Sequence, residues 1–393
     1  MTNISTYSKI YTYFLISYFL ILSIFVVFIL ISGCIGHDSI NDSINNDTVQ
    51  SISIEDKQIS NDSKQIIDNK QISSNKGAPY LGVFYYPWTG GNPEKSLDHT
   101  WLHWKDDKHD PPNTWASNYI PDYNGGKFDP YNGLYSSKDT NIIKQQLGLM
   151  KKAEIDFAIS SWWGKNSYED QTLDIIFNQV LPGEDNPYRE VKFCIYYEKD
   201  GFADVPKSDI ISDINYIKKK YTNSSYYFKI DGKPVVFVYN TKSGLFNETS
   251  QEEVQKWKEV RDEEGIYLVL KVFGGYQKVA DLADSWHEYA PATNMGFKQV
   301  GNYSAFVTPG FHKWHESPRL VREDFIRFDN NVKSLANANV SLKLIETWNE
   351  WGEGTGIEPA IRINHDDING FIPVEDSYGT QYIDIIGKYF VEK

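Results

Sequence analysis

Hydrophobic and polar positions divide the chain into three parts. Positions 10–31 are almost wholly apolar or aromatic, and positions 35–77 are rich in Asn, Ser, Asp, Ile and Gln without any sustained period. From position 78 onward, short apolar runs alternate with longer amphipathic stretches. A polar stretch without periodicity is typical of a disordered linker, whereas the alternation is typical of a folded α/β domain. We therefore predict a signal or anchor segment at 1–34, a disordered polar linker at 35–77 and one folded domain at 78–393.

Eight apolar runs in the folded part have the length and composition of buried strands. They span residues 80–88, 157–163, 191–198, 234–240, 266–273, 294–300, 303–309 and 342–350. Amphipathic stretches between them predict helices, among them 141–152, 209–220, 251–264 and 322–337. Strand followed by helix, repeated, predicts a parallel α/β fold, and the count and length fit a single (β/α)8 TIM-type barrel. A doubly wound sheet fits less well, because no glycine-rich dinucleotide-binding turn follows the first run.

The N-terminal segment indicates the compartment. Lys9 precedes the apolar run, which is long enough to span a bilayer, and Ile31-Ser32-Gly33-Cys34 resembles a lipobox. The acidic residues Asp38 and Asp42 favour an outward orientation of the chain beyond it. We expect either lipidation of Cys34 after cleavage or an uncleaved anchor helix. Both would tie the folded domain to the membrane at the cell surface, outside the cytoplasm.

Composition narrows the range of partners. The formal net charge is -14, the pI is about 5.1, and no Lys/Arg-rich run occurs, so we expect no nucleic acid partner. Two cysteines, Cys34 and Cys194, give no disulfide framework. His99, His103 and His109 occur near aspartates but match no tight ligand spacing, so we expect no metal and no cofactor. The oligomeric state is not predicted by these features.

Five of the predicted strands end in aromatic and polar residues. The strands end in Tyr85-Tyr86-Pro87-Trp88, Ser160-Ser161-Trp162-Trp163, Tyr196-Tyr197-Glu198, Tyr239-Asn240 and Thr347-Trp348-Asn349-Glu350. A barrel places its chemistry at the carboxyl ends of its strands. Aromatic faces stack on sugar rings while neighbouring polar groups bind the hydroxyls. The alternative is that aromatics merely close the barrel mouth, but the pattern over five strands favours a cleft for an oligosaccharide or polysaccharide.

The most specific motif is the block from Trp348 to Thr355. On a continuing strand Glu350 and Glu353 would face opposite ways, but Gly352 and Gly354 permit a sharp turn that brings both carboxyls to one cleft. Glycoside cleavage needs such a pair, one carboxyl as acid and the other to assist attack. We predict Glu350 and Glu353 as the catalytic residues. The alternative is a surface turn with two solvated glutamates.

Several motifs, in this order along the chain, resemble glycoside hydrolase family 99, whose characterised members are endo-acting α-mannosidases. They are Tyr85-Tyr86-Pro87-Trp88, His103-Trp104, Tyr135-Ser136-Ser137 with Asp139, Ser161-Trp162, Glu198, Gly232-Lys233-Pro234, and Asn349-Glu350-Trp351 through Glu353-Gly354-Thr355 with Ile357-Glu358. The resemblance implies a (β/α)8 barrel, retention of anomeric configuration and no metal. It also implies that Glu350 deprotonates the substrate's own 2-hydroxyl, which forms a 1,2-anhydro sugar, and that Glu353 acts as acid and then base.

The resemblance also implies which residues line the sugar subsites. They are Tyr86, His103, Trp104, Trp162, Glu198 and Tyr239, to which we add Trp348 and Asn349 of the catalytic block. Gly352 and Gly356 stand where the eukaryotic members have His and Gln, which predicts a reshaped cleft on the leaving-group side. Two other classes of function stay open: a glycan-binding surface protein without turnover, and a relative that acts in surface polysaccharide biosynthesis.

Overall fold

The computed structural model describes residues 79–184, 186, 188, 190–239, 247–314, 316–366, 370–373 and 376–391. The predicted signal or anchor segment with Cys34, and the predicted linker, lie outside the described residues. The described residues belong to one compact unit, whose fold follows. Within the described ranges, no helix combines the length and the apolar character needed to cross a membrane.

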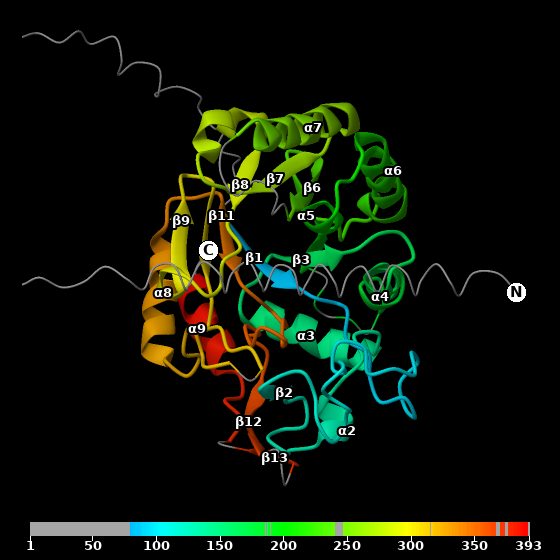
Figure 1. Ribbon diagram of the computed structural model, residues 1–393, viewed down its shortest axis with the longest axis vertical. Coiled ribbons are helices and arrows are strands. Elements are labelled where there is room, and N and C mark those ends of the chain that lie inside the picture. Colours follow the sequence, from blue (N-terminus) through cyan, green and yellow to red (C-terminus); the bar gives the residue numbers. More distant parts are fainter. Residues whose placement is uncertain are drawn as a thin grey trace, which may run out of the picture. The chain divides into compact units, whose positions relative to one another are not determined.

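Eight parallel strands form the central sheet (Figure 1). They are β1 (Tyr80–Tyr85), β3 (Phe157–Trp162), β4 (Lys192–Tyr197), β6 (Lys233–Val238), β7 (Tyr267–Lys271), β8 (Ser285–His287), β10 (Ser304–Val307) and β11 (Leu342–Ile345). The order of neighbours is β8-β7-β6-β4-β3-β1-β11-β10-β9, in which β9 (Phe297–Val300) runs antiparallel to β10. A short β5 (Lys229–Ile230) pairs with β6, also antiparallel.

The sheet curves into a barrel that is nearly closed. No backbone ladder joins β8 to β10 among the described residues. Instead, the hydroxyl of Ser304 on β10 donates to the main-chain oxygen of Trp286 on β8 at 2.8 Å. The gap between these two strands is called the seam below.

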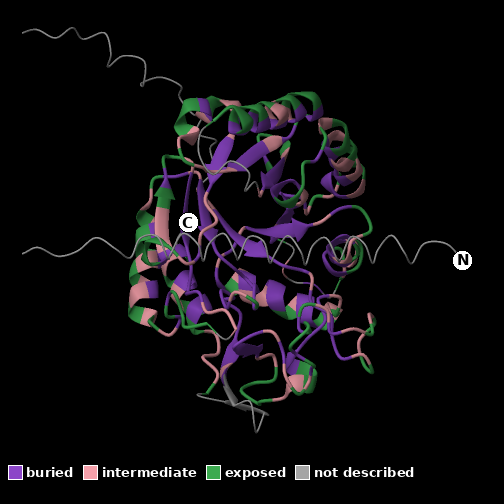
Figure 2. Ribbon diagram, in the orientation of Figure 1, coloured by how far each residue is buried: buried purple, intermediate pink, exposed green. Residues whose placement is uncertain are grey.

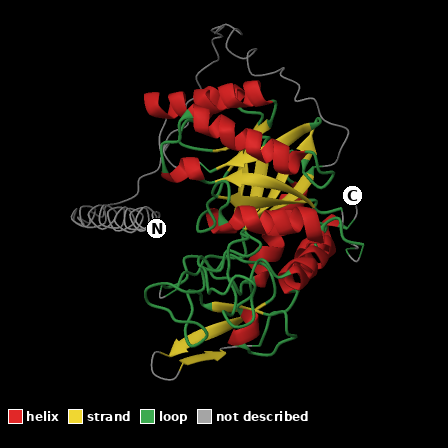
Figure 3. Cartoon of the chain, turned by 90° about the vertical axis from the view of Figure 1, so that its right-hand side faces the viewer, coloured by secondary structure: helices red, strands yellow, loops and turns green. Residues whose placement is uncertain are grey.

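Helices surround this sheet (Figure 3). They are α3 (Thr140–Lys152), α4 (Tyr168–Ile175), α6 (Lys207–Ile217), α7 (Glu248–Glu264), α8 (Phe325–Asn337) and α9 (Gln381–Phe390), with the short α5 (Lys199–Phe202). The short α2 (Pro130–Gly133) lies apart from them, beside the strand at Tyr119–Pro121 (Figure 1). Side chains of Asp139, Ser167, Asn247 and Asp324 accept from main-chain N–H groups at the helix starts. Such caps satisfy donors that have no partner inside the helix.

The strands are buried on both faces, as the purple sheet in Figure 2 shows. Helices cover the outer face, and large side chains such as Phe84, Tyr196 and Phe237 pack on one another inside. Parallel strands covered on both sides read as continuous apolar runs. This is why the apolar runs located most of the strands.

A smaller antiparallel sheet joins distant parts of the chain. It consists of β2 (Tyr119–Pro121), β12 (Ala360–Asp366) and β13 (Gly370–Pro373), in the order β13-β12-β2. Loops make up most of the surrounding region (Figure 3). A second apolar cluster lies here, built from Trp101, Trp104, Trp115, Tyr119, Ile120, Leu134, Trp351, Ala360, Ile361 and Ile363.

The predicted parallel α/β fold is confirmed, with two corrections. The run at 294–300 contains the antiparallel β9, and the sixth parallel strand is β8, whose three residues are too few to show a pattern. The barrel is nearly closed rather than a complete ring of eight paired strands. The four predicted helices occur within three residues of the expected starts.

Candidate active site

The two predicted catalytic glutamates follow β11. Glu350 is 7% exposed, and the side chain of Glu353 is 27% exposed. The main-chain N–H of Glu353 donates to Glu350 Oε1 at 2.9 Å, so the chain folds back onto the first carboxylate. Gly354 has φ +63°, and a Cβ there would lie 2.5 Å from the carbonyl oxygen of His312. Only glycine fits at this turn.

The surroundings of the pair disfavour two negative charges. Burial, with the neighbouring charge of Glu353, raises the pKa of Glu350 to about 8. Burial also raises the pKa of Glu353, but Lys313, whose Nζ lies 3.7 Å from Glu353 Oε1, opposes that rise. The Oε2 atoms of both glutamates are buried without a hydrogen-bond partner among the described residues. In the ligand-free protein, Lys313 therefore favours the charge on Glu353 and the proton on Glu350.

A tyrosine that the sequence analysis missed joins the cleft. Tyr289 follows β8, and its side chain acts against the rise that burial causes in the pKa values of Tyr86 and Glu353. Burial raises the pKa of Tyr86 and of Tyr289 well above the usual range, so both remain protonated donors. Tyr289 also packs against the ring of Tyr239, with ring centres 6.1 Å apart.

Glu198 lies directly after β4, which β3 and β1 separate from β11 in the sheet. It is buried, and burial raises its pKa to about 8, against a hydrogen bond from Ser161. Lys271, at the end of β7, was not predicted from the sequence. Its Nζ lies 4.3 Å from the centre of the Tyr239 ring, and its charge acts on both Glu198 and Glu353. The strand ends thus bring together carboxylates, a lysine and tyrosine hydroxyls.

Trp162 does not face the cleft. It is fully buried, and its indole N–H donates to Asp170 of α4 at 3.0 Å, so it packs between β3 and the outer helices. The neighbouring Trp163 is half-buried and donates to Ser161, the partner of Glu198, at 3.1 Å. Side chains alternate along a strand, so moving the assignment by one residue moves it to the other face.

Three further predicted subsite residues are buried in packing or positioning roles. Trp104 belongs to the second apolar cluster and donates to the main-chain oxygen of Tyr135 at 3.0 Å. Trp348 is fully buried in the main core. The amide of Asn349 accepts from the N–H of Tyr86 at 2.8 Å and donates to its carbonyl at 2.9 Å. Asn349 therefore positions Tyr86.

The remaining predicted residue, His103, is exposed. It has φ +61° and stacks on Trp88 with ring centres 4.4 Å apart. Trp88 lies two residues after Tyr86, and their rings are 4.5 Å apart. His103 and Trp88 thus extend the aromatic surface that begins at Tyr86.

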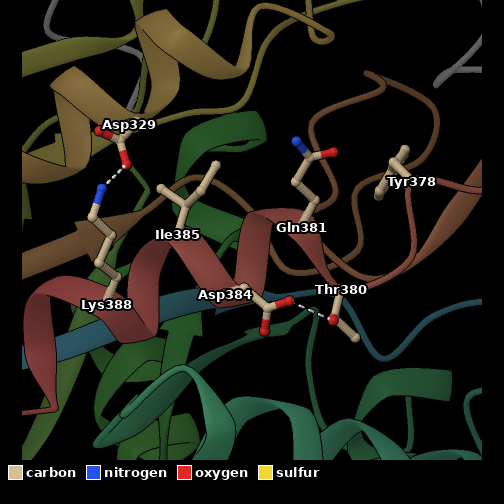
Figure 4. Close-up of a pocket in the computed structure, with 7 residues that line it drawn as sticks. All are labelled: Asp329, Tyr378, Thr380, Gln381, Asp384, Ile385 and Lys388. Atoms are coloured by element: carbon tan, nitrogen blue, oxygen red, sulfur yellow. Dashed lines mark hydrogen bonds and ion pairs between the residues drawn. The ribbon is translucent and has the colours of Figure 1, made fainter.

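Elsewhere, the described structure contains a hollow but no group of side chains that could hold a metal ion. The described part of the chain brings no three His, Cys, Asp or Glu side chains together as a metal site. A hollow of about 480 Å³ lies between α8 and α9 (Figure 4), where Lys388 pairs with Asp329 at 2.8 Å. No predicted site residue lines it.

Two family models match the chain. Glycosyl hydrolase family 99 matches residues 77–265, and a domain of unknown function, DUF5010, matches residues 196–392, half of the chain. The two matches overlap across the strands from β4 to β6 and helix α7. Together they reach from the first strand of the barrel to the last helix.

Relatives and solved structures agree with the first model. Glycoprotein endo-alpha-1,2-mannosidase of Mus musculus is 24% identical over 326 residues, covering 72% of this chain and 68% of the relative. The endo-alpha-1,2-mannosidase-like protein of Homo sapiens is 23% identical over 322 residues, with the same coverage. The structure of the GH99 endo-alpha-mannosidase from Bacteroides thetaiotaomicron has a TM-score of 0.60 at 20% identity, covering 80% of this chain and 97% of that one.

The structural match shows the same fold, and the family model and the relatives also support the similarity to family 99. The resemblance inferred from the motifs is thereby confirmed. This chain is an endo-acting glycoside hydrolase that is similar to family 99 over residues 77–265, and it belongs to the DUF5010 family, whose model matches residues 196–392.

Proposed function

We propose that this chain cleaves internal α-mannosidic bonds in a glycan, with Glu350 and Glu353 as its catalytic carboxylates. The observation that carries the proposal is the turn after β11, which places a buried glutamate beside a second one that pairs with Lys313. Its relatives are named as endo-α-1,2-mannosidases, which supports a mannoside as substrate.

The chemistry follows the mechanism that the family resemblance implies. The Glu350 carboxylate takes the proton of the sugar's 2-hydroxyl, whose oxygen bonds to the anomeric carbon. The glycosidic C–O bond breaks as Glu353 gives its proton to the departing oxygen, leaving a 1,2-anhydro sugar. Water then opens this ring at the anomeric carbon, giving one proton to Glu353 and keeping the other in the new anomeric hydroxyl, while Glu350 returns to the 2-oxygen the proton that it took in the first step. Two inversions give net retention.

This cycle requires a change in where the shared proton lies. Without ligand, burial places it on Glu350 and Lys313 favours the charge on Glu353. A sugar hydroxyl that donates to Glu350 stabilises its ionised form, and a glycosidic oxygen near Glu353 accepts from the protonated form. Binding of the glycan would thus move the proton to the residue that acts as acid, since coupled carboxyls titrate as a pair.

The cleft favours a neutral glycan with a different leaving group from that of the eukaryotic members. Trp88, Trp163 and Tyr239 provide aromatic surface, while Glu353, whose charge Lys313 favours, would repel an anionic glycan. A Cβ at Gly352 would meet only Glu350 Oε1, at 2.9 Å. Beyond the two adjacent residues, no other described atom lies within 4 Å of that Cβ, so the absence of a side chain at Gly352 supports a wider leaving-group side.

We propose further that the enzyme works at the cell surface. The apolar run at 10–31 and the lipobox-like Cys34 support a membrane tether, either through a lipid on Cys34 or through an uncleaved helix. The polar linker at 35–77 would hold the catalytic domain away from the membrane. Treatment with a protease on intact cells tests this, since release of the catalytic domain supports the surface location and full protection contradicts it.

The activity test uses the full chain in detergent with a panel of α-mannans. New reducing ends are measured for the native protein and for Glu350→Gln with Glu353→Gln. Oligosaccharides released only by the native protein support the proposal. Binding without release, unchanged by the double substitution, would favour a glycan-binding protein. Products formed only when an acceptor glycan is added would favour a biosynthetic role.

A further inference from the structure

The turn that carries the two glutamates rests on a buried tryptophan. Trp351 lies between Glu350 and Glu353 in the chain and is 2% exposed. Its indole N–H donates to Glu358 Oε1 at 2.8 Å. The guanidinium carbon of Arg322 lies 5.7 Å from the centre of its ring. An acidic side chain therefore holds its edge, and a basic side chain lies over its face.

Glu358 is fully buried and surrounded by donors. Besides Trp351, the hydroxyls of Tyr123 and Tyr135 and the amide of Gln146 donate to its carboxylate. Burial raises the pKa of Glu358 to about 7, and the four donors act against that rise. Indole and amide N–H groups can only donate, so the carboxylate must accept from them. The arrangement fixes the Trp351 indole with a charge-assisted hydrogen bond.

Arg322 is buried in a cage of aromatic rings, and its guanidinium bonds the same turn. Its guanidinium carbon lies 4.5 Å from the ring centre of Tyr119 and 5.5 Å from that of Tyr378. Its Nη1 donates to the carbonyl of Gly354 at 2.7 Å, and its Nη2 donates to the hydroxyl of Tyr378 at 2.8 Å. That hydroxyl donates to the main-chain oxygen of Glu358 at 2.8 Å, which links the two charged residues.

These contacts hold the chain on both sides of Glu353. Glu358 holds Trp351, two residues before it, and Arg322 holds Gly354, the residue after it. The carbonyl of Glu353 accepts from the N–H of His312 at 2.9 Å. Small shifts at Trp351 or Gly354 would therefore change the distance between the carboxyl groups of Glu350 and Glu353.

We propose that Arg322 and Glu358 are positioning residues, which act through Trp351 and Gly354 to set the separation of the two catalytic carboxyls. Both are buried, 1% and 0% exposed, and neither is placed to contact the glycan. The inference rests on the proposed function for the identity of the catalytic pair.

The test measures the pair without substrate. The full chain with ¹³C-labelled glutamate is titrated by NMR, and Glu350→Gln and Glu353→Gln assign the two resonances. In Glu358→Gln and in Arg322→Lys, the two apparent pKa values should move closer together, because carboxyls that are further apart repel each other less. On a cleaved glycan, kcat should fall by up to about 100-fold while KM changes little.

Two controls separate positioning from general loss of stability. Glu264→Gln changes another buried carboxylate, which pairs with Lys218 at 3.0 Å outside the site, and should leave the titration and kcat unchanged. Trp351→Phe removes the indole N–H, so adding Glu358→Gln to it should produce no further change in the titration. If Glu358→Gln does not fold, Arg322→Lys decides the test.

Two outcomes would overturn the proposal. The first is an unchanged separation of the two pKa values in Glu358→Gln and Arg322→Lys. The second is that adding Glu358→Gln to Trp351→Phe shifts the pKa values as much as Glu358→Gln does in the native protein. A chain that titrates as expected but cleaves no mannan contradicts the proposed function and supports the positioning role. A chain that cleaves mannan while its positioning variants titrate and react as the native protein contradicts the inference alone.

Discussion

At the scale of single residues, the two glutamates should fail in different ways. Glu353→Gln removes the proton donor, so hydrolysis of a mannan should slow by about 1,000-fold. Hydrolysis of an aryl α-mannoside, whose phenolate leaves unaided, should slow much less. Glu350→Gln removes the base and should slow both substrates by about 1,000-fold. Rates of both variants on both substrates check this assignment. Equal losses on the two substrates in both variants would contradict it.

Lys313 offers a second test at this scale. Its charge lowers the pKa of both Glu350 and Glu353. Lys313→Gln should therefore raise both values. The acidic limb of kcat, where Glu350 must ionise, and the alkaline limb, where Glu353 must keep its proton, should both move to higher pH, the alkaline limb further. A pH profile that matches that of the control Lys258→Gln, on α7, would refute this.

At the scale of elements, the two adjacent tryptophans at the end of β3 lie in different surroundings. Trp162 donates to Asp170 of α4, whereas Trp163 lies beside Ser161 and Glu198. Trp162→Phe should lower stability by about 1 kcal/mol, since the buried Asp170 Oδ1 loses one of two donors and keeps Tyr221, and should keep KM near the native value. Trp163→Ala should raise KM severalfold with little loss of stability. Thermal unfolding and kinetics of both variants check the pair.

Strand β3 also shows which features of the fold and the site can be predicted from the sequence. Apolar runs and helical periods locate most strands and helices, because buried parallel strands and amphipathic helices leave a local pattern. The glycines around Glu353 likewise predict its turn. The pattern does not say which of two adjacent tryptophans faces inward, nor does it show the three residues of β8. Tyr289 and Lys271 therefore escaped notice, because their role depends on a strand too short to detect and on contacts between distant segments.

At the scale of the whole molecule, the seam between β8 and β10 should be the weakest part of the barrel. Backbone ladders join the other parallel strands, while Ser304 contributes a side-chain hydrogen bond across the seam. Ser304→Ala should lower the unfolding free energy by about 1 kcal/mol and speed amide exchange in β8 more than in β3. Ser334→Ala, which removes a similar bond on the exposed face of α8, is the control. Equal exchange at β8 in both variants would contradict this.

The small antiparallel sheet has a consequence for how the protein folds during synthesis. Strand β2, near residue 120, pairs with β12, near residue 363, and β1 pairs with β11. A ribosome would release the first two strands long before their partners exist. Trp351 cannot be held until Glu358 and Tyr378 have emerged. A nascent chain can therefore collect most of its barrel strands, yet it acquires a working site only when its last segments leave the ribosome.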